Sequence, residues 1–156
     1  MAQVLIPPPP ETKDKNLDRW LNNLTSILRS YSSTWVPETN TDLYDMGDPG
    51  AATFVTADFT CDNAWHDLNL SAIVPAGTKA VFMRVLITDL SIGNFLRFRK
   101  NGNSNAITSP AARTQVANVT FEAPSILVFC DTNRVIEYLG NSAFDDIVVV
   151  ITGWIL

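Results

Sequence analysis

The chain has 156 residues and a formal net charge of −5, with 46% hydrophobic and 17% charged residues. This length suits one β domain with an N-terminal appendage, and the acidic balance argues against nucleic-acid binding, because phosphate contacts need clustered Lys and Arg. No apolar run approaches the roughly 20 residues of a membrane span. The charged fraction lies below the roughly 25% of typical soluble domains. We therefore expect partners to engage much of the surface, a neutral-surfaced monomer being the alternative.

Residues 1–11 combine a short apolar segment with four consecutive prolines, and they comprise Val4, Leu5 and Ile6 followed by Pro7, Pro8, Pro9 and Pro10. Consecutive prolines adopt an extended polyproline II conformation and cannot join a helix interior. We expect an arm that docks on a partner surface, a frayed terminus being the alternative. The segment lacks the basic start and long apolar stretch of a secretion signal, so we expect no export by that route.

Residues 12–32 predict an amphipathic helix, with Thr12 or Asp14 as N-cap. Its apolar residues fall at heptad a and d spacing and consist of Leu17, Trp20, Leu24, Ile27 and Tyr31, widened by Leu21 and Leu28. A helix of this length is only marginally stable alone, so the stripe must be buried. We expect a short parallel coiled coil between copies of the chain. A helix packed on its own β domain is the alternative.

Pro37, Gly47, Pro49 and Gly50 predict a linker or collar over residues 33–52. Over residues 53–156, short alternating apolar segments separated by turns predict a mainly β fold, an antiparallel β-sandwich or jelly roll of about seven to eight strands. The expected strands are 55–61, 65–70, 79–88, 94–100, 113–122, 126–130, 135–139 and 147–156. Asn101-Gly102 predicts a tight hairpin turn, and residues 131–134 are expected to join 126–130 and 135–139 as a hairpin.

Catalytic patterns are weak in this sequence. The single histidine, His66, precedes Asp67, but adjacent residues of a strand point to opposite faces and cannot easily form a dyad. The chain also lacks a nucleophile elbow and a phosphate-binding glycine loop. We therefore expect no enzyme activity and no cofactor. Cys61 and Cys130 have no metal-ligand partners at useful spacing and are expected to be free thiols, with a disulfide as the alternative.

Metal binding has one weak candidate. Asp42, Asp45 and Asp48 resemble part of a calcium loop, but the downstream Glu and the required Gly position are missing. We expect no metal.

Glycan contact is the binding hypothesis that the residues leave open. Amide groups suited to sugar hydroxyls gather in two predicted loops, at Asn101, Asn103, Asn105 and Asn133, and tryptophans that could stack on sugars are Trp35, Trp65 and Trp154. The alternative is structural, because Asn-Gly suits a type I′ turn and strand tryptophans usually belong to the core.

The segments Trp65–Ser71, Val74–Gly77, Phe98–Gly102 and Gly153–Leu156 resemble small β-sandwich domains of bacteriophage virion proteins of the tail-fibre, head-fibre and capsid-decoration type. Residues 152–154 are also similar to the last strand of trimeric jelly rolls of the complement C1q and tumour necrosis factor type. The resemblance implies a non-enzymatic homotrimer that is assembled in the host cytoplasm and held to other virion proteins by its arm and helix. A glycan-binding receptor-recognition module of a tail fibre is the alternative function.

Overall fold

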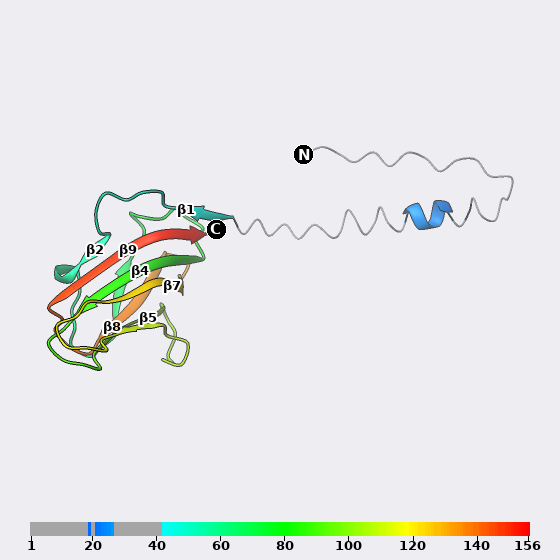
Figure 1. Cartoon of the computed structure of the whole chain (residues 1–156). Coiled ribbons are helices and arrows are strands. Elements are labelled where there is room, and N and C mark those ends of the chain that lie inside the picture. The colour runs from blue at the N-terminus through cyan, green and yellow to red at the C-terminus, as the bar shows by residue number, and fades with distance from the viewer. Residues whose placement is uncertain (1–18, 20, 27–41) are drawn as a thin grey trace. The chain divides into compact units, whose positions relative to one another are not determined.

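The computed structural model describes Arg19, residues 21–26 and residues 42–156 (Figure 1). The chain divides into two units, Met1–Asn40 and Thr41–Leu156. In the first unit, Arg19 and Leu21–Ser26 are helical. There the Thr25 hydroxyl donates a hydrogen bond to the Leu21 carbonyl, at 2.8 Å.

Most of the residues expected to carry assembly lie outside the described residues. These are the arm residues 4–10 and, in the predicted coiled-coil stripe, Leu17, Trp20, Ile27, Leu28 and Tyr31; Trp35 also lies outside. Of the stripe, Leu21 is half-buried and Leu24 is exposed. The helix over 12–32, its coiled coil and the docking arm therefore stay predictions.

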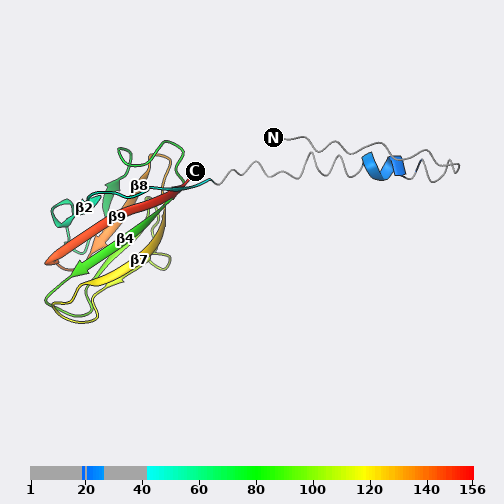
Figure 2. The same ribbon diagram turned by 45° about the horizontal axis from the view of Figure 1, so that its top comes forward.

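The second unit consists of two antiparallel sheets, which confirms the predicted mainly β class (Figures 1 and 2). One sheet has the order β1-β9-β4-β7, with β2 also paired to β9, and the other has the order β3-β8-β5-β6. The described residues form nine strands, a little above the expected number: β1 Leu43–Asp45, β2 Phe54–Val55, β3 His66–Asn69, β4 Ala80–Thr88, β5 Phe95–Lys100, β6 Ala111–Arg113, β7 Phe121–Phe129, β8 Val135–Gly140 and β9 Asp146–Ile155.

The core lies between the two sheets and follows from the two-residue period of the strands. Alternate residues of β4 are fully buried on one face, as the sequence predicts, namely Val81, Met83, Val85 and Ile87. The four-stranded sheet supplies buried residues that include Leu96, Phe98, Ile136 and Tyr138. One continuous apolar cluster therefore joins the sheets.

The free edges of the five-stranded sheet are short or irregular. At one edge, β7 pairs only with β4, and two of its residues, Pro124 and Ser125, lie opposite the single residue Arg84, which makes a β-bulge. Pro124 has no N–H to donate to a further strand. On the far side of β9 lie the short strands β1 and β2.

The predicted linker over 33–52 overlaps the sandwich. Leu43–Asp45 forms β1 and pairs with residues 153–155 of β9. Turn residues surround this segment, and a strand of three residues is too short to show an alternating pattern. The sandwich therefore begins before residue 53, where the sequence predicts its boundary.

The predicted strand over 55–61 is wrong. Strand β2 ends at Val55, and a 3-10 helix, η1, follows at Thr56–Asp58. The polar side chains that alternate here bind backbone groups: Asp58 accepts the Val55 N–H at 2.8 Å, and the Thr56 hydroxyl accepts the Ile147 N–H at 2.8 Å. Such side-chain hydrogen bonds compete with a strand ladder.

The predicted strand over 113–122 is also wrong, because β6 ends at Arg113 and β7 begins at Phe121. Between them, the buried Thr114 hydroxyl donates to the carbonyls of Ser91 and Asn94, at 3.0 and 3.3 Å. Asn118 has φ +60, a left-handed conformation that interrupts an extended chain.

The two predicted hairpins are corrected as well. Strands β7 and β8 do not pair; β7 pairs with β4, whereas β8 pairs with β3 and β5 in the other sheet. The Asn101-Gly102 turn has a positive φ only at Gly102, +84, so it is not type I′. The loop that it begins runs on to β6 at Ala111.

Candidate functional site

The outer side of the five-stranded sheet is apolar, and we call it the apolar face. Cross-strand partners place Phe82 beside Leu127, and Leu86 beside Val148. The apolar face consists of Leu43, Val55, Phe82, Leu86, Leu127, Phe129, Val148 and Val150. Leu43 is 68% exposed and Phe129 58%. Within the unit Thr41–Leu156, the sheet therefore presents to solvent a surface whose composition suits contact with protein.

One ion pair interrupts the apolar face. Arg84 Nε lies 2.6 Å from Glu122 Oε1, and the side chains are 47% and 42% exposed. The hydrogen bond from Arg84 lowers the pKa of the Glu122 carboxyl, and the same bond raises the pKa of Arg84. Arg84 stands opposite Val150 and Glu122 opposite Leu86, so the pair sits among apolar neighbours.

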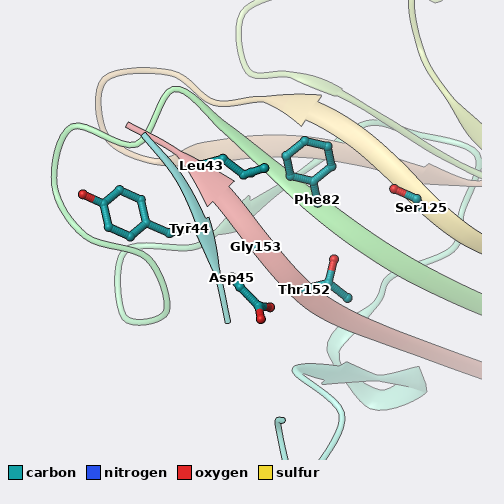
Figure 3. Close-up of a pocket in the computed structure, with 7 residues that line it drawn as sticks. All are labelled: Leu43, Tyr44, Asp45, Phe82, Ser125, Thr152 and Gly153. Atoms are coloured by element: carbon teal, nitrogen blue, oxygen red, sulfur yellow. The ribbon is translucent and has the colours of Figure 1, made fainter. Parts of the chain in front are cut away.

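A groove of about 330 Å³ opens on the apolar face where β1 meets β9 (Figure 3). Leu43 and Asp45 form one wall, Ser125 of β7 lies opposite, and Phe82 stands between them (Figure 3). Gly153 lines the floor, and a Cβ atom there would lie 2.5 Å from the Tyr44 carbonyl oxygen. Glycine therefore lets β1 approach β9 closely.

The expected tryptophan platforms are engaged inside the molecule. Trp154 packs against the core and stacks on Tyr44, with ring centroids 6.0 Å apart. The guanidinium of Arg99 lies 3.8 Å from the centroid of the Trp65 ring, and its Nε lies 2.5 Å from Glu137 Oε2. Neither described tryptophan is therefore a free stacking surface for a sugar.

Three turns converge at one end of the sandwich and form a cleft of about 560 Å³, here called the end cleft. They precede β4, follow β5 and follow β7. The end cleft is lined by Gly77, Thr78, Lys79, Lys100, Asn103, Phe129, Cys130, Asp131 and Thr132.

The structure brings together only part of the predicted glycan-contact set. Asn103 lines the end cleft, and Asn105 lines a neighbouring depression with Ile107 and Thr108. The Asn101 amide donates to Asp131 Oδ2, at 3.0 Å, so it holds the turn. Asn133 lines neither hollow.

Sequence reasoning missed Lys79, Lys100 and Phe129 as cleft residues. Lys79 immediately precedes β4, and Lys100 and Phe129 end β5 and β7, so each looks in the sequence like an ordinary residue at a strand end. The one signal in the sequence is that all three residues lie next to turns. Nothing local indicates that these turns meet in space.

The His66 side chain contacts neighbouring side chains of the fold. Its Nε2 lies 2.8 Å from Asp62 Oδ1, and its ring lies 5.6 Å from that of Tyr138. The hydrogen bonds that Asp62 accepts from His66 and from the Ala64 N–H lower the pKa of Asp62.

The two cysteines are thiols. Burial is the larger cause that raises the pKa of Cys61, and the negative charge of Asp62 is the smaller one, so the thiol is held protonated. Cys61 and Cys130 are free, as predicted.

Two of the three aspartates that resemble a calcium loop are hydrogen-bonded within their own loop. Asp45 accepts the Gly47 N–H at 3.1 Å, and Asp42 accepts the Tyr44 hydroxyl at 3.3 Å. Over the residues that the structure describes, no group of three or more His, Cys, Asp or Glu could hold a metal ion. No helix in the same residues has the length and apolar character to cross a membrane.

Comparison with known proteins finds no family model that matches this chain and no curated protein that matches it. The geometry of the apolar face and the end cleft is therefore the basis for a functional hypothesis.

Proposed function

We propose that this chain is a non-enzymatic structural protein of a bacteriophage virion, a decoration, spike or fibre/adaptor component. It assembles as a homotrimer and docks on the particle through residues 1–11 and the helix over 12–32. The observation that carries the proposal is the apolar face, which in a protein of this size favours a covering partner. Copies of the same chain are the partners that the heptad pattern in the sequence supports.

The place where the chain enters the sandwich supports this choice of partner. Asp42 is the first described residue of the second unit. Its backbone carbonyl accepts the Leu156 N–H at 3.2 Å, beside the C-terminal end of β9. The next residue, Leu43, already belongs to the apolar face. If the preceding segment joins copies through its heptad, the sandwiches are held at high local concentration with respect to one another.

Native mass spectrometry and sedimentation of the full chain at micromolar concentration test the proposal. We expect a species of three times the 17.2 kDa chain mass. The double variant Leu24→Asn, Ile27→Asn should dissociate it, since both residues belong to the predicted heptad stripe. A wild-type monomer under these conditions would overturn the homotrimer.

The apolar face has its own variant and a matched control. The double variant Leu43→Ser, Leu127→Ser removes apolar area from the face, and we expect at least tenfold weaker association, because burial of each leucine contributes about 2 kcal/mol. Ile107→Ser is the control, because Ile107 is 94% exposed on a loop outside the face. Equal association of both variants would exclude the face as a subunit contact.

Particle attachment is tested separately. Deletion of residues 1–10 should leave the oligomer intact and abolish co-sedimentation with particles of a phage that encodes the chain. Retained attachment would show that the arm does not dock the protein. Absence of the chain from purified particles would contradict the virion assignment itself.

A glycan-binding receptor module is the second candidate function. The end cleft favours it, because Asn103 and Thr132 offer amide and hydroxyl groups beside the exposed ring of Phe129.

A further inference from the structure

Two lysines are among the residues that line the end cleft. Lys79 and Lys100 both line it, and neither forms an ion pair with a carboxylate of the described residues. The chain as a whole carries a net charge of −5. The two lysines therefore make the cleft locally positive in a protein whose net charge is negative. A positive cleft favours an anionic ligand.

The one carboxylate of the cleft is occupied by its own turn. Asp131 Oδ1 accepts the N–H groups of Asn133 and Val135, at 2.9 and 2.7 Å. Its Oδ2 accepts the Asn101 amide. Asp131 offsets one positive charge, but its oxygens already serve as acceptors inside the protein. Counting the two lysines and Asp131, the cleft keeps a net charge of +1.

The remaining walls suit a sugar ring better than a bare anion. Phe129 presents an exposed aromatic ring, and such rings pack against apolar C–H surfaces. Asn103 and Thr132 add side chains that both donate and accept hydrogen bonds. The volume, about 560 Å³, lies within the roughly 300–1,000 Å³ of small-ligand sites.

We propose that the end cleft binds an acidic saccharide. Its carboxylate lies against Lys79 and Lys100, and its ring packs on Phe129. Its hydroxyl groups bond to Asn103 and Thr132. The site is built from one chain, so it rests on the glycan-binding candidate function and not on the proposed homotrimer, although Phe129 also belongs to the apolar face.

A matched pair of ligands isolates the carboxylate. Isothermal titration of the full chain at low salt is run with methyl galacturonoside and methyl galactoside, which differ only in that group. Methyl N-acetylneuraminoside is a second acidic probe, and inorganic phosphate tests a bare anion. We expect at least one acidic probe to bind, at least tenfold more tightly than methyl galactoside and phosphate.

Variants then place the binding in the cleft. Lys100→Ala and Phe129→Ala should each weaken the acidic probe about fivefold or more, whereas Lys100→Arg should keep affinity within about threefold. Arg113→Ala removes an exposed cation from another surface and should have no effect. Native mass spectrometry of each variant reports the oligomer independently.

The proposal is overturned if neither acidic probe binds at 20 mM, or if phosphate binds as tightly as the saccharide. Binding that is insensitive to Lys100→Ala and Phe129→Ala would also overturn it. A monomeric protein that binds the acidic probe would contradict the homotrimer and leave the cleft proposal supported.

Discussion

Gly153→Ala is expected to release β1 from β9. The added Cβ atom would lie 2.5 Å from the Tyr44 carbonyl oxygen, well inside van der Waals contact, and this oxygen belongs to the backbone, so it cannot rotate away as a flexible side chain could. β1 has three residues and pairs with β9. The clash is therefore relieved more easily when β1 separates from β9 than when the β9 backbone distorts. The groove in Figure 3 would lose its β1 wall.

The contacts that are lost when β1 separates from β9 determine how far the free energy of unfolding falls. They include the hydrogen bonds from Met46 N–H to the Thr152 carbonyl, 3.0 Å, and from Leu156 N–H to the Asp42 carbonyl, 3.2 Å. The Tyr44–Trp154 stack also separates. With about 1 kcal/mol for each of these hydrogen bonds and a similar amount for the stack, the loss of these contacts alone should lower the free energy of unfolding by about 3 kcal/mol.

Urea denaturation measures this loss, and amide hydrogen exchange locates it. The Met46 and Leu156 amides should lose protection in the variant, while those of β4 keep it. Gly50→Ala is the matched control, because its added Cβ meets nothing within 4 Å. Unchanged stability together with unchanged protection of Met46 in Gly153→Ala would refute the close approach of β1.

Three further predictions concern charged groups and thiols. Burial would raise the pKa of Asp131, but hydrogen bonds from Val135 N–H, the Asn101 amide and Asn133 N–H outweigh it and lower the pKa. The stability from this depressed pKa is present above the ordinary value of 3.8 and is lost as pH falls through the folded pKa. The stability gap between wild type and Asp131→Asn should therefore narrow below about pH 4 in urea titrations, and a constant gap would contradict this cause. Burial, with the charge of Asp131, raises the pKa of Cys130 to about 11, so a thiol reagent at pH 8 should label it much more slowly in the folded than in the urea-unfolded Cys61→Ala protein; equal rates would exclude a buried thiol. Arg99→Ala should destabilise the fold by about 3–5 kcal/mol, because it leaves Glu137 as an unpaired, largely buried charge; a thermal-unfolding loss below about 1 kcal/mol would count against that pair.

The sequence predicts strand β4 well because its alternation persists over several residues, whereas β7 is missed as one strand because Pro124 and its bulge interrupt it. In β4, Val81, Met83, Val85 and Ile87 share the buried face that their spacing predicts. Short elements fail for the same reason. Strand β1 and the 3-10 helix η1 have three residues each, too few for a period to appear.

Pairing between strands is predicted less well because turns carry ambiguous information. The Asp131 turn has the composition of a hairpin, yet it carries the chain from one sheet to the other. Arg134 takes part in this redirection, with φ +64 and Nη1 donating to the carbonyls of Ser71 and Val74. These acceptors lie about sixty residues earlier, beyond the reach of a local pattern.

The candidate sites depend on the same long-range information. The apolar face arises because β4, β7 and β9 carry apolar residues on their outer as well as their inner side, a pattern that the sequence equally offers for fully buried strands. The end cleft needs three turns that are distant in the chain, at Lys79, Lys100 and Asp131. Asn103 could be suggested from composition, but its two lysine neighbours could not.

The bulge at Pro124 bears on how a protein with an exposed apolar face avoids aggregation through the edge of its sheet. An even, unprotected strand at the rim would let molecules add to one another without end, as in amyloid. Here the rim is kinked and lacks a donor at Pro124, and the opposite rim offers only brief strands. Replacing Pro124 with a strand-forming residue should therefore favour insoluble fibrils.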